Sequence, residues 1–498
     1  MPLPRRHSHL FIGIDPRSTE PLQVQVYAAI RRAILDGVVA PGARLPSSRE
    51  LAADLGVSRT TTVLAFDQLA AEGYLTTREG SGSFVTRELP DDRPRGPVAV
   101  GGRTARHPAM SRRGRALAAM PPTALKIDGA PRAFRLGVPA LDRFPIDIWV
   151  RLAGRRLKAA TAAQLDYGDP AGLLALREAI ADYVGRSRGT SCTAEQVIVV
   201  AGAQQGLDLI CRVLLDPGDL AWMEEPGYPG AWNALIAAGA RIALLPVDAQ
   251  GMTLDHAARR GGAAARLVYV TPSHQFPLGV PMSLARRLAL LAWARRARAW
   301  VVEDDYDSEF RFGTRPIPCL HGLDVDSRVI YVGSFSKTIF PALRLGFLIV
   351  PADLRDAVVW ARRALDIHPP GMDQAVLADF IGDGHFERHL RRMRADYRAR
   401  LEALGTAAAR HCRGALQLRP VTTGLHTVAD LKGIDDRVVF REAMTRGVEA
   451  MPLSAYRLER RKRSASGLVL GFGGVRPELF DEAMKKLAAA IQAARRTK

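Results

Sequence analysis

The strongest constraint on the fold is the alternation, from about Phe134 onward, of short β-branched runs with Ala-, Leu- and Arg-rich stretches. The β-branched runs lie at residues 197–200, 267–270, 300–302, 329–332 and 345–350. Strands that alternate with helices are joined by crossover connections, so this pattern predicts an α/β fold with a largely parallel sheet. With 498 residues, the chain is long enough for two or three domains.

Composition divides the chain into four parts. An amino-terminal tail covers residues 1–19, a compact helical unit covers 20–87, and the α/β pattern occupies 131–498. Residues 88–130 are rich in Pro, Gly and Arg and show no periodicity. Such a composition predicts a mobile, positively charged linker between two domains.

The formal net charge of +19 predicts attraction to a polyanion, with nucleic acid favoured over a membrane. An arginine-rich genomic bias is an alternative explanation for part of this excess.

The distribution of cysteines and the lack of long apolar segments predict the cellular compartment of the protein. The four cysteines are scattered and form no Cys-x-x-Cys pair, so we expect neither a disulfide framework nor a metal site. The start of the chain lacks the apolar core of a signal peptide, and no stretch approaches the roughly 20 apolar residues of a membrane helix. We therefore expect a soluble, cytoplasmic protein without a membrane partner.

The amino-terminal unit is predicted to contain three helices. Leu22, Val26, Ile30 and Ile34 recur every four residues and mark the inner face of a first helix that ends at Gly37. The run 47–50 is a capping box that opens a second helix, which stops at Gly56. Ser58 then caps a third helix over residues 59–71, whose inner face carries Val63, Phe66 and Leu69.

The second and third helices have the spacing of a helix-turn-helix, joined by Gly56-Val57. The third would be the recognition helix, with Arg59, Thr60 and Thr61 in its first turn. Residues 74–77 and 83–85 bracket a glycine-containing tip, which predicts a two-stranded ribbon. Geometry alone also allows a plain packing module.

Four motifs in this unit closely resemble the winged helix of GntR-type regulators. They are Leu45-Pro-Ser-Ser-Arg-Glu-Leu-Ala, Leu55-Gly-Val-Ser-Arg-Thr-Thr, Leu69-Ala-Ala-Glu-Gly-Tyr-Leu and Gly80-Ser-Gly-Ser-Phe-Val. The resemblance implies binding to double-stranded DNA. By that resemblance the major groove and its phosphates are contacted by Arg49, Ser58, Arg59, Thr60 and Thr61, and the minor groove by Gly80, Ser81 and Gly82.

Lys337 is the most distinctive residue of the α/β region. Positive charge in this chain is almost always arginine, and between Lys158 and Lys432 the only lysine is Lys337. An arginine cannot condense with an aldehyde, whereas a desolvated lysine can lose its proton and attack one. An isolated lysine is usually a solvated surface residue, so the neighbouring motifs decide the interpretation.

Five groups of residues lie at or just after the ends of predicted strands, where open α/β sheets bind ligands. Residues 201–205 open a helix whose free N–H groups suit a phosphate. Taken singly, each group also has an ordinary explanation as a turn, a packing residue or a solvated charge. The other four groups are Tyr228 after Pro-Gly, the acidic run 303–307, Ser334 with Lys337, and Arg344.

Together these groups resemble the fold-type I aminotransferases, which bind pyridoxal 5′-phosphate (PLP). The resemblance implies that Lys337 is the Schiff-base lysine, that Asp304 pairs with the pyridinium nitrogen, and that Tyr306 bonds the ring hydroxyl. It further implies that Tyr228 stacks on the ring and that the phosphate is held by Ala203, Gln204, Ser334 and Arg344. Tyr167 matches a tyrosine that reaches the phosphate of the neighbouring subunit, which implies a homodimer.

Two positions depart from the aminotransferase pattern. Phe276 stands where many of these enzymes have an asparagine beside the ring. Val469 aligns with the arginine that binds the substrate carboxylate, and Arg457 or Arg476 could replace that arginine. Efficient transamination of α-amino acids is therefore in doubt.

The layout of winged helix, basic linker and aminotransferase-like domain resembles the MocR-type regulators of the GntR family. That resemblance implies a multidomain fold, a helix-rich winged helix-turn-helix followed by an α/β PLP-dependent transferase-like domain of fold type I. We expect a regulator that senses an amine, an amino acid or PLP itself through aldimine formation at Lys337, and that binds an operator with two half-sites. The alternative is a genuine PLP-dependent aminotransferase with an appended DNA-binding domain; slow or partial transamination is compatible with a sensor.

Overall fold

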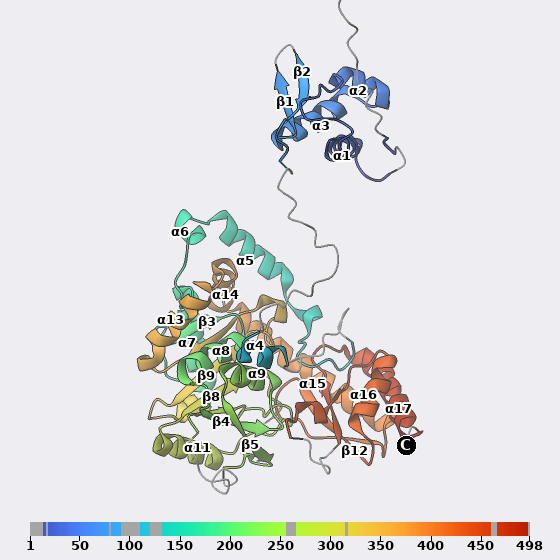
Figure 1. Ribbon diagram of the computed structural model, residues 1–498. Coiled ribbons are helices and arrows are strands. Elements are labelled where there is room, and N and C mark those ends of the chain that lie inside the picture. Colours follow the sequence, from blue (N-terminus) through green and yellow to red (C-terminus); the bar gives the residue numbers. More distant parts are fainter. Residues whose placement is uncertain are drawn as a thin grey trace, which may run out of the picture. The chain divides into compact units, whose positions relative to one another are not determined.

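The computed structural model describes residues 13–15, 18–78, 81–90, 110–119, 132–254, 265–313, 317–459 and 466–496. Contacts within the chain divide it into two compact units, residues 1–108 and residues 109–498 (Figure 1). We call the first unit the head and the second the body.

The head contains three helices and a β-hairpin, as predicted (Figure 1). The helices are α1 (Leu22–Leu35), α2 (Ser48–Leu55) and α3 (Arg59–Ala71), and the antiparallel hairpin pairs β1 (Leu75–Arg78) with β2 (Gly82–Val85). Ser47 and Glu50 form the predicted capping box at the start of α2. Gly56 ends that helix in the left-handed conformation, which glycine adopts without steric cost.

The buried residues of the head match the predicted inner faces of the helices, except at Leu22 and Val63. Val26, Ile30 and Ile34 of α1 are buried, but Leu22 is 39% exposed because it lies at the start of the helix. On α3 the buried residues are Thr62, Ala65, Phe66 and Leu69, whereas Val63 is only partly buried. The Thr62 hydroxyl donates to the Ser48 carbonyl oxygen at 2.8 Å, which fixes the angle between α2 and α3 and turns Thr62 inward.

The body is built on an eight-stranded sheet with the strand order β3-β10-β9-β8-β7-β4-β5-β6. Strands β4, β5, β7, β8 and β9 pair in parallel, as predicted, whereas β10 is antiparallel to both β3 and β9. The bounds are β3 (Val197–Val200), β10 (Gly346–Ile349), β9 (Val329–Ser334), β8 (Trp300–Asp305), β7 (Leu267–Val270), β4 (Leu220–Glu225), β5 (Arg241–Asp248) and β6 (Gly251–Met252).

A second, antiparallel sheet of four strands forms the carboxy-terminal part of the body (Figure 1). Its order is β11-β12-β14-β13, with bounds β11 (Leu416–Leu418), β12 (His426–Leu431), β14 (Gly467–Gly471) and β13 (Met451–Pro452). Helices α16 and α17 pack together beside it. We call β11 to β14 with α16 and α17 the small lobe.

The helices of the body carry most of the remaining apolar core. Their bounds are α5 (Ile146–Lys158), α6 (Ala162–Leu165), α7 (Leu174–Arg188), α8 (Ala203–Leu214), α9 (Pro229–Ala238), α11 (Leu284–Ala297), α12 (Leu320–Leu323), α13 (Arg355–Asp366), α14 (Gly371–Gly382), α15 (His385–His411), α16 (Asp436–Thr445) and α17 (Phe480–Arg496). In the part of the chain that the structure describes, no helix is long and apolar enough to cross a bilayer.

A short helix, α4 (Arg112–Ala118), lies inside the stretch that the sequence suggested was an aperiodic linker. Ser111 caps it by accepting a hydrogen bond from the Gly114 N–H at 2.9 Å. Helix α4 contacts α9 of the body (Figure 1). The predicted linker therefore includes a short ordered helix that belongs to the body. The prediction for residues 91–109 and 120–130 lies outside the described residues.

Candidate functional site

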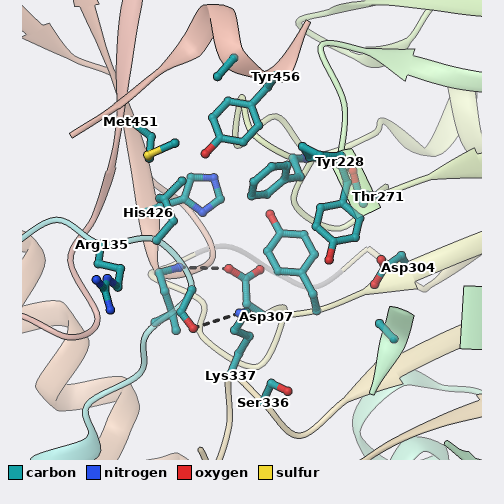
Figure 2. Close-up of a pocket in the computed structure, with 18 of the residues that line it drawn as sticks. Arg135, Tyr228, Thr271, Asp304, Asp307, Ser336, Lys337, His426, Met451 and Tyr456 are labelled. Carbon is teal, nitrogen blue, oxygen red and sulfur yellow. Dashed lines mark hydrogen bonds between the residues drawn. The ribbon is translucent and has the colours of Figure 1, made fainter. Parts of the chain in front are cut away.

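A cavity of about 830 Å³ lies in the body and brings together the residues that the sequence singled out (Figure 2). Its walls come from the ends of β8 and β9, the start of α8, and the small lobe. Eight of the nine predicted cofactor-binding residues line it: Ala203, Gln204, Tyr228, Asp304, Tyr306, Ser334, Lys337 and Arg344. The parallel strands end at one edge of the sheet, which is why motifs far apart in the sequence meet here.

Lys337 lies three residues beyond the end of β9, and its amine is buried in the cavity (Figure 2). The Nζ atom donates a hydrogen bond to the Gly137 carbonyl oxygen at 2.9 Å. Burial lowers the pKa of Lys337, although Asp307 and Asp304 partly offset that effect. A lysine with a lowered pKa has more of its amine in the nucleophilic form. Gly137 has a positive φ of 73°, which favours glycine, and a Cβ there would lie 2.5 Å from Nζ, so any larger residue would displace the amine.

The acidic run at the end of β8 divides between the two faces of the sheet, because successive strand residues point in opposite directions. Asp304 points into the cavity (Figure 2). Its Oδ2 atom accepts a hydrogen bond from the Tyr269 hydroxyl at 2.7 Å, while the buried Oδ1 atom has no partner among the described residues. Burial raises the pKa of Asp304 to about 7. The unpartnered oxygen suits a protonated ring nitrogen.

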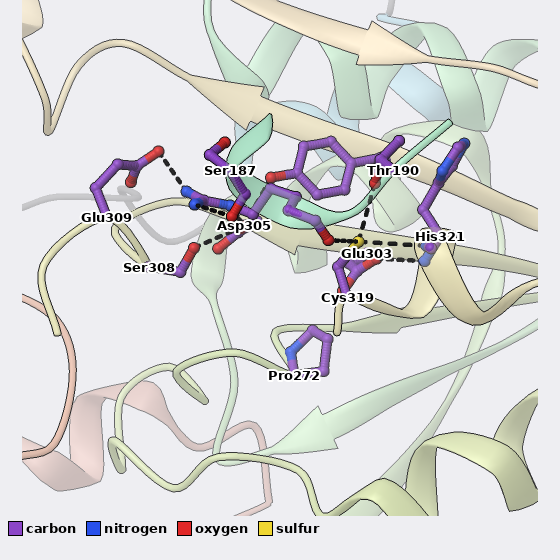
Figure 3. A network of polar contacts seen from close by, with 12 residues as sticks. Ser187, Thr190, Pro272, Glu303, Asp305, Ser308, Glu309, Cys319 and His321 are labelled. Carbon is purple, nitrogen blue, oxygen red and sulfur yellow. Dashed lines mark hydrogen bonds and ion pairs between the residues drawn. The ribbon is translucent and has the colours of Figure 1, made fainter. Parts of the chain in front are cut away.

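Glu303 and Asp305 face the opposite side and belong to a separate polar network (Figure 3). Asp305 pairs with Arg188 at 2.8 Å and accepts a hydrogen bond from the Tyr331 hydroxyl at 2.6 Å. Burial alone would raise the pKa of Asp305, but the Arg188 guanidinium lowers it below its usual value. Glu303 accepts hydrogen bonds from the first N–H groups of α12. These two carboxylates are therefore structural, and Asp304 alone of the three serves the cavity.

The start of α8 and Arg344 lie side by side at one end of the cavity. Gly202 precedes α8 without a side-chain cap, which leaves the first N–H groups of the helix available to a phosphate. The guanidinium of Arg344 lies so close that a Cβ on Gly202 would be 3.1 Å from Nη1. Arg344 itself adopts a positive φ of 52°, an unusual conformation for this residue type that is found at functional sites.

Aromatic rings form the remaining walls. Phe276 occupies the position where many aminotransferases have an asparagine beside the ring. It makes edge contacts with Tyr228 and Tyr456, with 5.6 Å and 5.2 Å between ring centroids. The Tyr306 hydroxyl donates to the His274 carbonyl oxygen at 2.9 Å, and His274 Nδ1 lies 2.9 Å from Asp307 Oδ1. The Tyr306 hydroxyl also lies 3.0 Å from His274 Nδ1, so the imidazole that Asp307 holds helps to orient Tyr306 within the cavity.

Several lining residues were not singled out from the sequence. Tyr269 lies inside β7 and His426 begins β12, and neither has a local motif that distinguishes it from an ordinary core residue. Burial and the neighbouring His274 lower the pKa of His426 to about 3, so its imidazole is neutral. Asp307, His274 and His426 place their ligand atoms within 4.8 Å of one another. Each of the three is already hydrogen-bonded within the protein, as the His426 bond to the Pro277 carbonyl oxygen illustrates.

Three predicted residues lie outside the cavity. Tyr167 is 75% exposed and contacts His368 edge to face, with 5.8 Å between ring centroids. Arg476 is 62% exposed and pairs with Asp142 at 3.9 Å. Neither Arg476 nor Arg457 lines the cavity, so the structure does not support either one as a replacement for the carboxylate-binding arginine.

In the head, the predicted DNA contacts lie on α2, α3 and the hairpin. Arg49, Arg59 and Thr60 are exposed, and Thr61 is partly buried. Ser58 caps α3, because its hydroxyl oxygen accepts from the Thr61 N–H at 3.2 Å. In the hairpin Ser81 is exposed and Gly82 lies against Arg44, with 3.1 Å from a Cβ on Gly82 to Arg44 Nε; Gly80 lies outside the described residues.

Three buried carboxyls of the body, of which only Asp304 lines the cavity, make stability depend on pH. Burial raises the pKa of Glu224, Glu303 and Asp304 to about 7 in each case. A raised pKa in the folded state means that the folded protein holds the proton more tightly than the unfolded chain. The contribution to stability is therefore full at low pH and is lost as the pH rises through 7.

We expect the cofactor-free protein to lose about 1 kcal/mol of unfolding free energy per carboxyl between pH 6 and pH 8. Glu224→Gln should remove one such contribution, since the amide oxygen can still accept the hydrogen bonds from Thr271. Thermal unfolding at the two pH values measures the effect. An unchanged difference between pH 6 and pH 8 in the variant would contradict the assignment.

Family models of known proteins match both the head and the body. Residues 22–85 match the family model "Bacterial regulatory proteins, gntR family", and residues 136–465 match "Aminotransferase class I and II". The chain is 41% identical over 96% of both sequences to the probable rhizopine catabolism regulatory protein MocR of Rhizobium meliloti. It is 34% identical to the pyridoxine biosynthesis transcriptional regulator PdxR of Corynebacterium glutamicum, over 93% of this chain and 94% of PdxR.

Among solved structures, the body is similar to LysN, the α-aminoadipate aminotransferase of Thermus thermophilus. The TM-score is 0.68 at 28% identity, and the match covers 74% of this chain and 93% of LysN. That enzyme was crystallised with N-(5′-phosphopyridoxyl)-L-leucine. Because both family models and the full-length relatives agree, the chain belongs to the MocR-type transcriptional regulators of the GntR family, with a DNA-binding winged helix joined to a fold-type I aminotransferase-like domain.

Proposed function

We propose that this regulator senses a small primary amine, or PLP itself, at Lys337 and transmits the result to its DNA-binding head. One observation carries the proposal: the buried amine of Lys337, with its pKa lowered, shares a cavity with Asp304 and Arg344. A reactive amine, a carboxylate with an unpartnered oxygen and a guanidinium beside a helix start are the three groups that PLP requires of a protein.

Each cavity residue has a distinct proposed role toward PLP. Arg344, Ser334 and the first turn of α8, including Ala203 and Gln204, would hold the phosphate. Asp304 would keep the ring nitrogen protonated, Tyr228 would stack on the ring, and Tyr306 would bond the ring hydroxyl. When bound, the cofactor supplies an aldehyde carbon that reacts with primary amines. Lys337 would provide the resident amine, and the Gly137 carbonyl oxygen holds its Nζ in position.

We propose a homodimer in which Tyr167 reaches the phosphate site of the partner. Exposed apolar side chains support an interface on this part of the body. Val150 and Leu157 on α5 are 61% and 62% exposed, and Leu165 of α6 is 70% exposed. Two heads would then bind two half-sites, at a spacing set by the reach of the chain between the head and α4.

The alternative function is an active aminotransferase. It is supported by the eight predicted PLP-binding residues that line the cavity, since an aminotransferase needs the same residues. The two functions differ in their measurable products. A regulator should show specific retardation of its own upstream DNA that changes when an amine is added, with at most slow single-turnover chemistry. Sustained multi-turnover release of a keto acid from an ordinary amino acid, with DNA binding insensitive to amines, would overturn the sensing proposal.

The proposed recognition helix gives a prediction for DNA binding. Each arginine–guanine pair contributes roughly 1–3 kcal/mol of discrimination, so Arg59→Ala should weaken operator binding about tenfold or more. Arg32 is exposed on α1, outside the predicted DNA-binding surface, so Arg32→Ala serves as the matched control and should change the affinity about twofold at most. Gel retardation at fixed salt measures both, and equal effects of the two substitutions would contradict the assignment of α3.

A further inference from the structure

Two arginines that line the cavity, Arg437 and Arg441, have no role in the proposed binding of PLP. The cavity lining includes five basic side chains, namely Arg135, Lys337, Arg344, Arg437 and Arg441, and three carboxylates, namely Asp304, Asp307 and Glu449. Lys337 and Arg344 have proposed roles toward PLP, and Arg135 pairs with Glu449. The two remaining cations, Arg437 and Arg441, belong to α16 of the small lobe.

The position where an aminotransferase arginine was expected is apolar. Val469 lies in the middle of β14 and is fully buried. It packs in a cluster with Val428, Leu453 and Tyr456. A guanidinium cannot be placed in that cluster without burying an unpaired charge, so β14 does not bind an acid group.

Helix α16 provides the cations instead. Arg437 and Arg441 are four residues apart, so they lie on the same face of the helix, and with Phe440 they line the cavity. The start of the helix is fixed by Asp436, which accepts hydrogen bonds from the Ser454 N–H and hydroxyl. Arg437 Nε also donates to the Ser454 hydroxyl oxygen at 3.1 Å. These contacts hold the guanidinium of Arg437 in a defined place at the cavity wall.

The ion pairs leave these two arginines available. Arg135 pairs with Glu449 at 2.7 Å, and Asp307 lies 2.9 Å from His274. Within the described ranges, neither Arg437 nor Arg441 has a carboxylate within ion-pair distance. A planar guanidinium with available N–H groups is suited to bind a carboxylate in bidentate fashion.

From this arrangement we infer that α16 forms an anion subsite, made by Arg437 and Arg441, that selects amines carrying an acid group. The inference rests on the proposed sensing function, since the amine end of the ligand would condense with the aldehyde carbon of PLP in place of the Lys337 amine. The effector class is then a zwitterion such as an amino acid, with its acid group directed toward the small lobe. Simple alkylamines and amino-acid amides would lack the partner for α16.

The test compares acids with their amides in the purified protein loaded with PLP. Glycine, β-alanine and 4-aminobutanoate are each titrated beside the corresponding amide, while the absorption spectrum of the cofactor is recorded. The three acids place the carboxylate at increasing distance from the amine. The variants are Arg437→Gln, Arg441→Gln and the double variant, and the control is Arg476→Gln, an exposed arginine outside the cavity.

We expect at least one acid to bind about tenfold more tightly than its amide, the size of one charge-assisted contact. Each single variant should reduce this preference, the double variant should abolish it, and Arg476→Gln should retain it. Equal binding of acids and amides in the unsubstituted protein, or an undiminished preference in the double variant, would overturn the subsite while leaving amine sensing intact. A spectrum that responds to neither acids nor amides would overturn both the sensing function and the subsite.

Discussion

Lys337→Ala should abolish every covalent attachment of PLP to the protein. The lysine amine is buried, its pKa is lowered, and its Nζ is held by the Gly137 carbonyl oxygen. Among the described residues, no other lysine lines the cavity. Borohydride reduction followed by peptide mapping should find the cofactor on Lys337 in the unsubstituted protein and nowhere in the variant. The response of the cofactor spectrum to added amines should change at the same time.

Lys337→Arg separates the charge of the side chain from its chemistry. The guanidinium keeps the positive charge opposite Asp304 and Asp307 but cannot condense with an aldehyde. We therefore expect this variant to lose the borohydride-stable adduct as completely as Lys337→Ala does. Lys432 is exposed, and Lys432→Ala should retain the full adduct. An adduct that survives in Lys337→Arg would show that the reactive amine is elsewhere.

Asp304→Ala should weaken PLP binding by at least about 100-fold. Removal of one partner from a buried charge pair costs roughly 3–5 kcal/mol, because the remaining charge is left unpaired. Here the remaining groups would be the ring nitrogen and the Tyr269 hydroxyl, which now donates to Asp304 at 2.7 Å. Titration of the cofactor-free variant with PLP, followed by absorbance, measures the loss.

Two further variants distinguish the charge of Asp304 from its shape. Asp304→Asn keeps an oxygen that can accept from Tyr269, so it should fold normally and still bind PLP poorly. Tyr269→Phe removes the hydroxyl but leaves the carboxylate, and it should weaken binding less than about tenfold, the size of one hydrogen bond. If Asp304→Asn binds PLP as tightly as the unsubstituted protein, the ring nitrogen is not paired with a carboxylate here.

The site residues at strand ends were predictable because the carboxyl ends of parallel strands lie at the same edge of the sheet. Asp304 is the penultimate residue of β8, Lys337 follows β9 and Ala203 starts the helix after β3, so all three lie near one edge of the sheet. The head was predictable for a local reason. Its caps at Ser47 and Ser58 and its glycine stop at Gly56 depend on residues only a few positions apart.

The small-lobe side of the cavity was not predictable in this way. His426, Tyr456 and Arg441 reach the site because an antiparallel sheet packs beside the large sheet, and no short motif encodes such packing. The antiparallel direction of β10 could not be predicted from the sequence either. A strand buried on both faces is continuously apolar whether it runs parallel or antiparallel to its neighbours. Helix α4 was missed because it is short and contains Gly114.

The acidic residues of β8 point to opposite faces of the sheet, and this limits where insertions and deletions can occur in the protein. Insertion or deletion of a single residue in the strand ahead of Glu303 would exchange the faces. Glu303 and Asp305 would then project into the ligand space, and Asp304 would meet Arg188. Every amino acid would still be present, yet both the PLP site and the salt-bridged network of Figure 3 would be lost. Indels should therefore be tolerated in the surface loops of this domain and not tolerated between Trp300 and Asp305.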